Sequence, residues 1–213
     1  MSEYPIIPLF PLAVVVFPDQ TLPLHIFESR YRELIVDCRA AEAVGGLLPF
    51  GISFGRDVTV EREVGCTVVV EKVLTEYEDG RLDIITTGRD RYRLVEVFAE
   101  KSYLTAAVEF FEDEEEVADA LLLERVREEY GRLSLLIEAE SGMQLEDPTP
   151  EHSFRLALSA GLPPEVRQEL LEMRSENLRL QRIEAHFETL IPELEVLHEK
   201  ERRVRSNGRT KKI

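Results

Sequence analysis

Residues 51–55 form the one pattern in the sequence that is typical of a catalytic site, Gly51-Ile52-Ser53-Phe54-Gly55. They match G-x-S-x-G, in which two glycines allow a sharp turn from a strand into a helix and expose a nucleophilic serine. Here the residues after Gly55 favour a turn and a strand, and the chain lacks the repeated alternation of strands and helices that this hydrolase fold needs. The sequence therefore favours a buried structural Ser53, and a serine hydrolase that uses it is the remote alternative.

Other patterns of catalysis or metal binding are missing from the sequence. It contains no G-x-x-x-x-G-K-[ST] loop for nucleotide phosphates, no H-E-x-x-H or C-x-x-C motif and no EF-hand loop. Two cysteines, Cys38 and Cys66, are too few for a disulfide framework or a zinc site of four cysteines. The histidines lie apart in the sequence, at His25, His152, His186 and His198. We therefore predict a protein that is not an enzyme, with no catalytic residue, no metal site and no cofactor.

The composition excludes further classes of protein. The 213 residues carry 26 Lys and Arg against 42 Asp and Glu, a net charge of −16, whereas binding to nucleic acid needs clustered cations. The uncharged segment 4–18 is broken by four prolines and is shorter than the roughly 20 apolar residues of a membrane span. It also lacks the basic flank and cleavage site of a signal peptide. We predict a cytoplasmic protein that binds neither nucleic acid nor a membrane.

The first half of the chain has the two-residue period of strands. Val64, Cys66 and Val68 alternate with residues suited to the opposite face, and Asp79-Gly80 joins two such runs as a hairpin turn would. One helix, over 28–43, interrupts these strands. We expect about six strands, in the segments 6–16, 47–54, 64–78, 81–87, 91–98 and 103–111, and the first of these segments is expected to supply two.

From about residue 115 the period becomes helical. We expect helices over 117–140, from an N-cap at Thr149 to Gly161, from 163 to 173, and from a cap at Ser175 onward. The last helix carries apolar residues at steps of three and four, which are Leu180, Ile183, Phe187, Leu190, Leu194 and Leu197. This stripe is expected to pack on the preceding helices, and assembly of a homodimer or docking on another protein is its alternative use. Pro192 is expected to kink or restart the helix.

Together these patterns predict an α+β protein in three parts. Residues 1–115 are expected to hold about six strands and one inserted helix, and residues 116–200 a group of C-terminal helices. Residues 201–213 are basic and are predicted to be a disordered tail.

Apolar residues are unusually dense near the N-terminus. The runs Leu9–Leu12, Val16–Pro18 and Leu22–Phe27 come close together, and proline-stiffened loops among them cannot all be buried. A contiguous exposed apolar patch is typical of a site for a peptide or a protein partner.

The same segment resembles the opening of the N-terminal substrate-binding domain of Lon proteases. The similarity lies in Pro8-Leu9-Phe10-Pro11-Leu12, Val16-Phe17-Pro18, Leu22-Pro23-Leu24-His25-Ile26-Phe27-Glu28 and Arg30-Tyr31. Later pieces follow in the family's order, namely Val64-Gly65-Cys66, Asp79-Gly80-Arg81, Gly88 with Arg91-Tyr92-Arg93, and Tyr103-Leu104-Thr105-Ala106. The resemblance implies a PUA-like, six-stranded β pseudo-barrel with one inserted helix over residues 1–115 and a C-terminal helical bundle over 116–200. It also implies a domain that recognises unfolded or tagged substrates. Since the sequence holds no Walker motif and no Ser–Lys protease domain, it resembles a stand-alone member of that family.

We therefore predict a non-catalytic module that recognises an unfolded polypeptide or a protein partner, linked to protein quality control and to a separate ATPase or protease. The apolar patch between the barrel and the helices is the predicted site. Its predicted residues are Phe17, Leu22, Leu24, Phe27 and Tyr31. Assembly through the stripe of the last helix is the alternative function.

Overall fold

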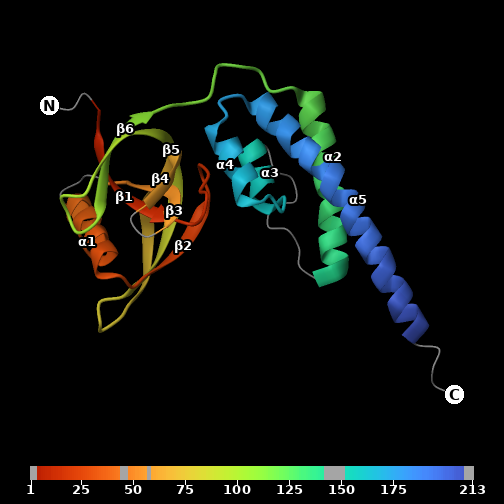
Figure 1. Cartoon of the computed structure of the whole chain (residues 1–213), viewed down its shortest axis with the longest axis horizontal. Helices are drawn as coiled ribbons and strands as arrows, with labels where there is room; N and C mark the ends of the chain where they lie inside the picture. The colour runs from red at the N-terminus through yellow and green to blue at the C-terminus, as the bar shows by residue number, and fades with distance from the viewer. Residues whose placement is uncertain (1–3, 44–47, 57–58, 142–151, 209–213) are drawn as a thin grey trace. The chain divides into compact units, whose positions relative to one another are not determined.

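The chain consists of a β-sheet with one inserted helix, followed by a group of helices (Figure 1). The computed structural model describes residues 4–43, 48–56, 59–141 and 152–208. The chain divides into two units. The first holds residues 1–113 together with 164–172, and the second holds 114–163 together with 173–213.

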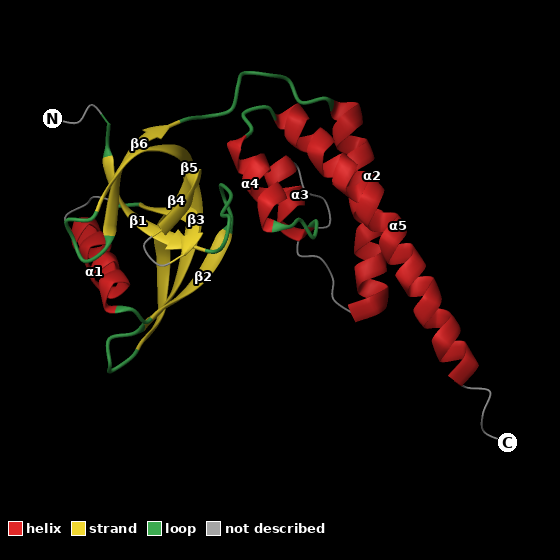
Figure 2. Cartoon of the chain, in the orientation of Figure 1, coloured by secondary structure: helices red, strands yellow, loops and turns green. Residues whose placement is uncertain are grey.

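Six strands form the sheet of the first unit (Figure 2). They are β1 (Ile6–Leu12), β2 (Thr21–Ile26), β3 (Phe50–Arg56), β4 (Thr59–Glu76), β5 (Leu82–Phe98) and β6 (Leu104–Phe110). Their order is β2-β5-β4-β3-β1-β6, and a further pairing of β5 with β6 closes five of them into a barrel. β1 runs parallel to β3, and the other pairs are antiparallel. This confirms the predicted α+β class with a six-stranded sheet.

Two strands are longer than the sequence pattern suggested. β4 and β5 span 18 and 17 residues. β4 begins before the predicted strand 64–78, and β5 joins the two predicted strands 81–87 and 91–98 into one. Register shifts interrupt their pairing at three places, between Cys66 and Val68, between Val70 and Lys72, and between Val73 and Thr75. Because such bulges bend a strand without ending it, the apolar alternation changes phase within one element. The predicted Asp79-Gly80 turn lies between the two strands, with Gly80 at a φ of 81°.

The N-terminal strands also differ from the prediction. The segment 6–16 supplies β1 alone, and the next strand is β2. Pro23 lies inside β2, where proline is tolerated because β2 pairs with β5 only, among the described strands.

Helix α1 (Ser29–Ala43) belongs to the first unit and packs its apolar face on the rest of that unit. Leu34 and Ile35 are fully buried, and the ring of Tyr31 stacks on Phe10 of β1 with 3.8 Å between the ring centres. The predicted helix over 28–43 agrees with these bounds.

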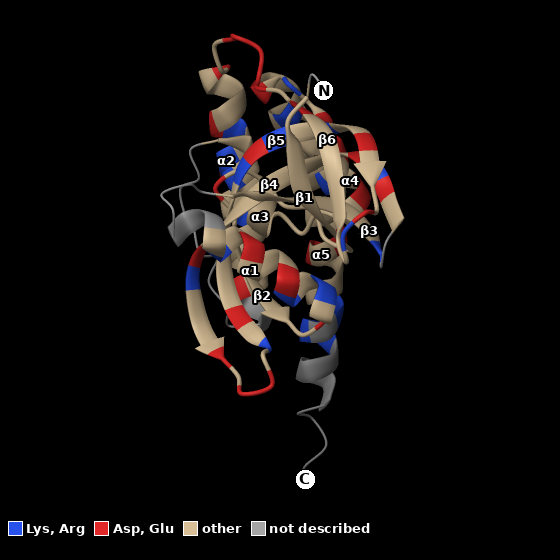
Figure 3. Ribbon diagram, turned by 90° about the vertical axis from the view of Figure 1, so that its left-hand side faces the viewer, with Lys and Arg blue, Asp and Glu red and all other residues tan. Residues whose placement is uncertain are grey.

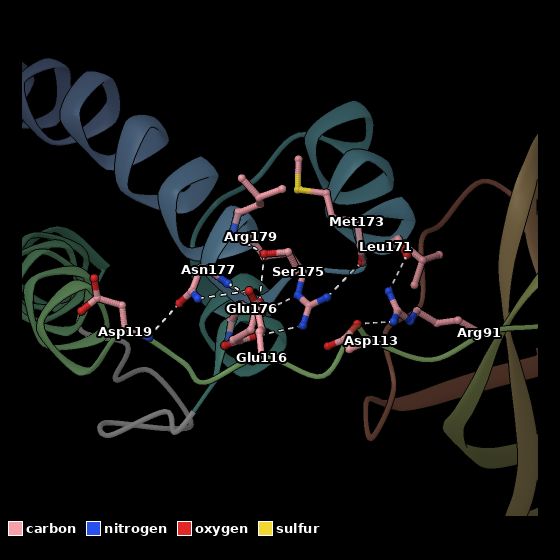
Figure 4. A network of polar contacts seen from close by, with 12 residues as sticks. Arg91, Asp113, Glu116, Asp119, Leu171, Met173, Ser175, Glu176, Asn177 and Arg179 are labelled. Carbon is pink, nitrogen blue, oxygen red and sulfur yellow. Dashed lines mark hydrogen bonds and ion pairs between the residues drawn. The ribbon is translucent and has the colours of Figure 1, made fainter.

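Helix α4 (Pro164–Glu172) belongs to the first unit, although the sequence assigned it to the helical part. Gln168 Nε2 donates to the carbonyl oxygen of Val64 at 3.0 Å, and the buried Arg91 donates to that of Leu171 at 3.1 Å. Arg91 also pairs with Asp113 (Figure 4). Gln168 and Val64 lie 104 residues apart in sequence, and Arg91 and Leu171 lie 80 apart, so the helical period alone could not reveal these contacts.

The second unit contains α2 (Ala120–Ser141), α3 (Ser153–Ser159) and α5 (Glu176–Gly208). Leu180, Ile183 and Phe187 of the predicted stripe are fully buried, and α5 contacts both α2 and α3. The first part of the stripe is therefore core. Ser175 caps α5 as predicted, since its Oγ accepts from the backbone N–H of Leu178 at 3.1 Å.

The structure bears on two predictions for α5. α5 neither ends nor restarts at Pro192, because this residue and Glu188 are exposed and water can satisfy the carbonyl that loses its intrahelical partner. The helix continues to Gly208, well into the segment predicted as a tail. Residues 209–213 and the predicted cap at Thr149 lie outside the described residues.

Arg179 organises the start of α5 and is 1% exposed. Its guanidinium donates to Glu176 Oε2 at 2.7 Å and to the carbonyl oxygen of Met173 at 3.0 Å (Figure 4). It also donates to Ser153 Oγ at 2.8 Å. It also lies over the ring of Phe154. One buried cation thus ties α3 to α5.

Acidic residues lie mainly outside these cores. Figure 3 shows them in red at the turn between β4 and β5 and along the segment that follows β6. Residues Glu112–Glu116 in that segment are all exposed and account for part of the chain's negative charge. Some of them still have polar partners, since Asp113 pairs with Arg91 and Glu116 accepts hydrogen bonds from Asn177.

Candidate functional site

Ser53 does not have the surroundings of a nucleophile. It is fully buried in β3, and a hydrogen bond of 2.7 Å joins its Oγ to the hydroxyl oxygen of Tyr92. No helix follows Gly55, since β4 begins at Thr59. The structure therefore contradicts the hydrolase alternative, because a nucleophilic serine needs an adjacent base and access for its substrate.

The glycines around Ser53 have a packing role instead. A Cβ added at Gly51 would lie 2.5 Å from the hydroxyl oxygen of Tyr92, and one added at Gly65 would lie 2.4 Å from it. Both glycines thus leave room for the tyrosine ring between β3 and β4. At Gly55 an added Cβ would lie 2.1 Å from the carbonyl oxygen of Thr59, where the β3–β4 pairing shifts register. The motif encodes close packing rather than catalysis.

An open groove lies on the first unit, with a cavity volume of about 500 Å³. One wall is the end of β1, another is β2, and a third is the segment that leads into α1. The end of β3 adds Gly55 and Arg56. The lining residues from the three walls are Phe10, Pro11, Leu12, Ala13, Pro23, Leu24, His25, Ile26, Phe27, Glu28, Arg30 and Tyr31. Most are apolar, as in sites that take apolar side chains.

Three of the five predicted site residues meet at this groove. Leu24 is half-buried on β2, Tyr31 is 4% exposed and forms part of the floor, and Phe27 is 61% exposed. An exposed phenylalanine next to an apolar hollow is costly to keep in water. Leu24, Phe27 and Tyr31 therefore form one apolar surface at the groove, to which an apolar side chain can bind.

The other two predicted residues do not line the groove. Phe17 is fully buried, with the guanidinium of Arg167 from α4 over its ring at 4.6 Å. Leu22 is half-buried on β2 and lies outside the lining. The expectation that Phe17 is part of a surface patch was wrong, because α4 covers it from far along the chain.

Sequence reasoning missed Pro11, Ala13 and Arg56 as parts of the site. They come together because β1 and β3 pair in parallel, with Leu12 opposite Phe54. Nothing in the local pattern of either strand signals that pairing.

The groove also carries charged groups. Arg30 Nη2 lies 2.6 Å from Glu28 Oε2, and the Arg30 guanidinium lies over the ring of Tyr31 at 4.6 Å. His25 Nδ1 lies 2.6 Å from Asp83 Oδ1. This contact and a second hydrogen bond from the Tyr77 hydroxyl hold the pKa of the Asp83 carboxyl below its usual value.

Thiols and metal ligands offer no second site in the part of the chain that the structure describes. Burial raises the pKa of both Cys38 and Cys66 to about 12, so that the thiols stay protonated at neutral pH. No group of three or more His, Cys, Asp or Glu among the described residues could hold a metal ion. None of the described helices is both long and apolar enough to cross a membrane.

Known proteins share this fold. A Lon N-terminal domain protein from Xanthomonas campestris is 25% identical, with a TM-score of 0.61 over 85% of this chain and 98% of that one. The N-terminal domain of a Lon protease from the Mycobacterium avium complex has the same TM-score at 16% identity, over 87% of this chain and 100% of that one, which shows the fold alone. The family model of the ATP-dependent protease La (LON) substrate-binding domain matches residues 6–187. With its barrel, its helices and this match over most of its length, the chain belongs to the LON substrate-binding domain family.

Proposed function

We propose that this chain is a non-catalytic recognition module that binds a segment of unfolded polypeptide in the groove of its first unit. The observation that carries the proposal is Phe27, 61% exposed at the rim of an apolar hollow. Membership of a family of substrate-binding domains supports the same function.

Binding is proposed to use side chains that enter the groove, rather than a strand that adds to β2. β2 has an unpaired edge among the described strands, which is the geometry that strand addition requires. However, Pro23 lies in the middle of this strand and has no backbone N–H, so the free edge cannot offer a regular row of donors. The groove beside that edge is apolar and already formed. It can take an aromatic or aliphatic side chain against Phe27 and Tyr31 without rearrangement.

We further propose that the bound polypeptide is held for another chain that carries ATPase or protease activity, as part of protein quality control. The sequence itself contains no nucleotide-binding loop. The alternative function, assembly through the α5 stripe, has less support because Leu180, Ile183 and Phe187 are already buried within the second unit.

The test compares two exposed apolar residues of the first unit. Phe27→Asp places a charge at the groove, and Val36→Asp places one on α1 outside it, where Val36 is 59% exposed. Binding of fluorescein-labelled unfolded casein is measured by fluorescence anisotropy. We expect Phe27→Asp to weaken binding by about tenfold or more and Val36→Asp to change it less than about twofold. Equal effects of the two substitutions, or no binding by the unaltered chain, would reject the proposal.

A further inference from the structure

The charge of the groove is opposite to that of the chain. Its lining contains two arginines, Arg30 and Arg56, and one carboxylate, Glu28, whereas the whole chain carries 42 acidic against 26 basic residues. Arg56 is exposed at the end of β3 and forms no ion pair with another described residue. A cation that pairs with no carboxylate of the described residues, next to an apolar hollow, attracts an anionic group in whatever binds there.

The start of α1 points to the same kind of ligand. The first turn of a helix is the positive end of its dipole, where Asp or Glu is stabilising and a cation is not. The first turn of α1 contains no acidic residue, and Arg30 lies in it. Glu28, just before the helix, offsets part of this charge through its contact with Arg30 Nη2.

Arg30 also keeps unused hydrogen-bonding capacity. A guanidinium has five N–H donors. The Arg30 Nε atom is buried and has no hydrogen-bond acceptor in the described structure. Since Arg30 is held between Glu28 and the ring of Tyr31, its charge stays at the groove. Together with Arg56 and the helix start, it makes this region cationic.

On the basis of the polypeptide binding proposed above, we infer that the groove selects segments in which Asp or Glu lies next to the aromatic or aliphatic residue that fills the hollow. The apolar side chain packs against Phe27 and Tyr31, and the neighbouring carboxylate lies near Arg30 and Arg56. The acidic surface elsewhere repels the same carboxylate, so that the charge favours this groove over other apolar positions.

The inference is tested with three labelled peptides that are acetylated and amidated, so that no terminal charge takes part. They share one sequence around a central Phe-Leu pair and differ in a single neighbouring residue, which is Asp, Gln or Lys. We expect the Asp peptide to bind about fivefold more tightly than the Lys peptide, with the Gln peptide between them. The difference decreases as sodium chloride is added, because salt screens exposed charges.

Two charge reversals locate the preference. Arg56→Glu is expected to abolish or invert the order of the three peptides. Arg62→Glu makes the same change of net charge on β4, at an exposed residue outside the groove, and is expected to leave the order unchanged. Equal affinities for the three peptides, or an unchanged order in Arg56→Glu, would overturn the inference about charge. Polypeptide binding itself stands in that case if Phe27→Asp weakens all three peptides, and it fails if none of them binds.

Discussion

The buried hydroxyl pair of Ser53 and Tyr92 offers a sharp test of the interpretation that Ser53 is structural. Both residues are fully buried, and 2.7 Å separates the two hydroxyl oxygens. Ser53→Ala leaves the Tyr92 hydroxyl without its hydrogen-bond partner, and Tyr92→Phe leaves the Ser53 hydroxyl without its partner. Each is expected to lower the free energy of unfolding by about 1–3 kcal/mol, the cost of an unsatisfied buried polar group.

The double variant removes both oxygens and leaves neither unsatisfied. We expect it to cost only about 1 kcal/mol, whereas the two single costs add to about 2–6 kcal/mol, so that the two substitutions are coupled by about 1–5 kcal/mol. The assay is urea unfolding of the full chain, with hydrogen exchange of peptides from β3 and β4 to assign the change to the first unit. Single variants within about 0.5 kcal/mol of the unaltered chain, or costs that simply add, would refute the reasoning.

A matched control uses an exposed tyrosine of the same unit. The Tyr77 hydroxyl donates to Asp83 Oδ2 at 2.7 Å near the hairpin turn. Because water can replace that contact, Tyr77→Phe is expected to cost less than about 1 kcal/mol.

Three further predictions concern the helices and the hairpin. Arg179→Met is expected to destabilise the second unit by about 3–5 kcal/mol, because it leaves Glu176 and Ser153 without their buried partner. Thermal unfolding by circular dichroism measures this, and Arg203→Met at an exposed ion pair is the control. His186 has its pKa lowered mainly by burial, so below the usual pKa of about 6.5 the unfolded chain binds a proton that the folded chain does not. The free energy of unfolding measured in urea is therefore expected to decrease as the pH is lowered from about 7 to about 5.5, and to decrease less in His186→Gln. Gly80→Ala is expected to cost about 1 kcal/mol in urea unfolding, because its φ of 81° is strained for any residue with a Cβ.

Each of these predictions has an outcome that contradicts it. An Arg179→Met chain as stable as Arg203→Met would show that the buried network contributes little. If the free energy of unfolding decreases equally at low pH in His186→Gln, the proton taken up on unfolding belongs to another group. An unchanged stability of Gly80→Ala would mean that the turn adapts without strain.

Local features of the fold could be predicted from the sequence. The Asp79-Gly80 turn and the Ser175 cap depend on the conformations and hydrogen bonds of a few adjacent residues, and both are present as expected. The three- and four-residue spacing of α1 and α5 likewise identified buried faces.

Features that depend on distant contacts could not be predicted. The apolar run around Phe17 has the composition of an exposed loop, and only the position of α4, with Arg167 over the ring, buries it. The groove arises from the parallel pairing of β1 with β3 beside β2, so that Arg56 becomes a neighbour of residues near the N-terminus. Local patterns predict which segments become strands, but not which strands pair.

The most direct test of the proposed polypeptide site is to map where a bound chain lies. A photoreactive benzoylphenylalanine replaces Phe27 in one variant and Phe110 in another, since both are exposed phenylalanines of the first unit and only Phe27 lines the groove. After illumination with unfolded casein, crosslinked product is measured by gel and the sites are mapped by mass spectrometry. We predict strong crosslinking from position 27 that excess unlabelled peptide suppresses, and little from position 110. Equal crosslinking from both positions, or none from position 27, would contradict a polypeptide site in this groove.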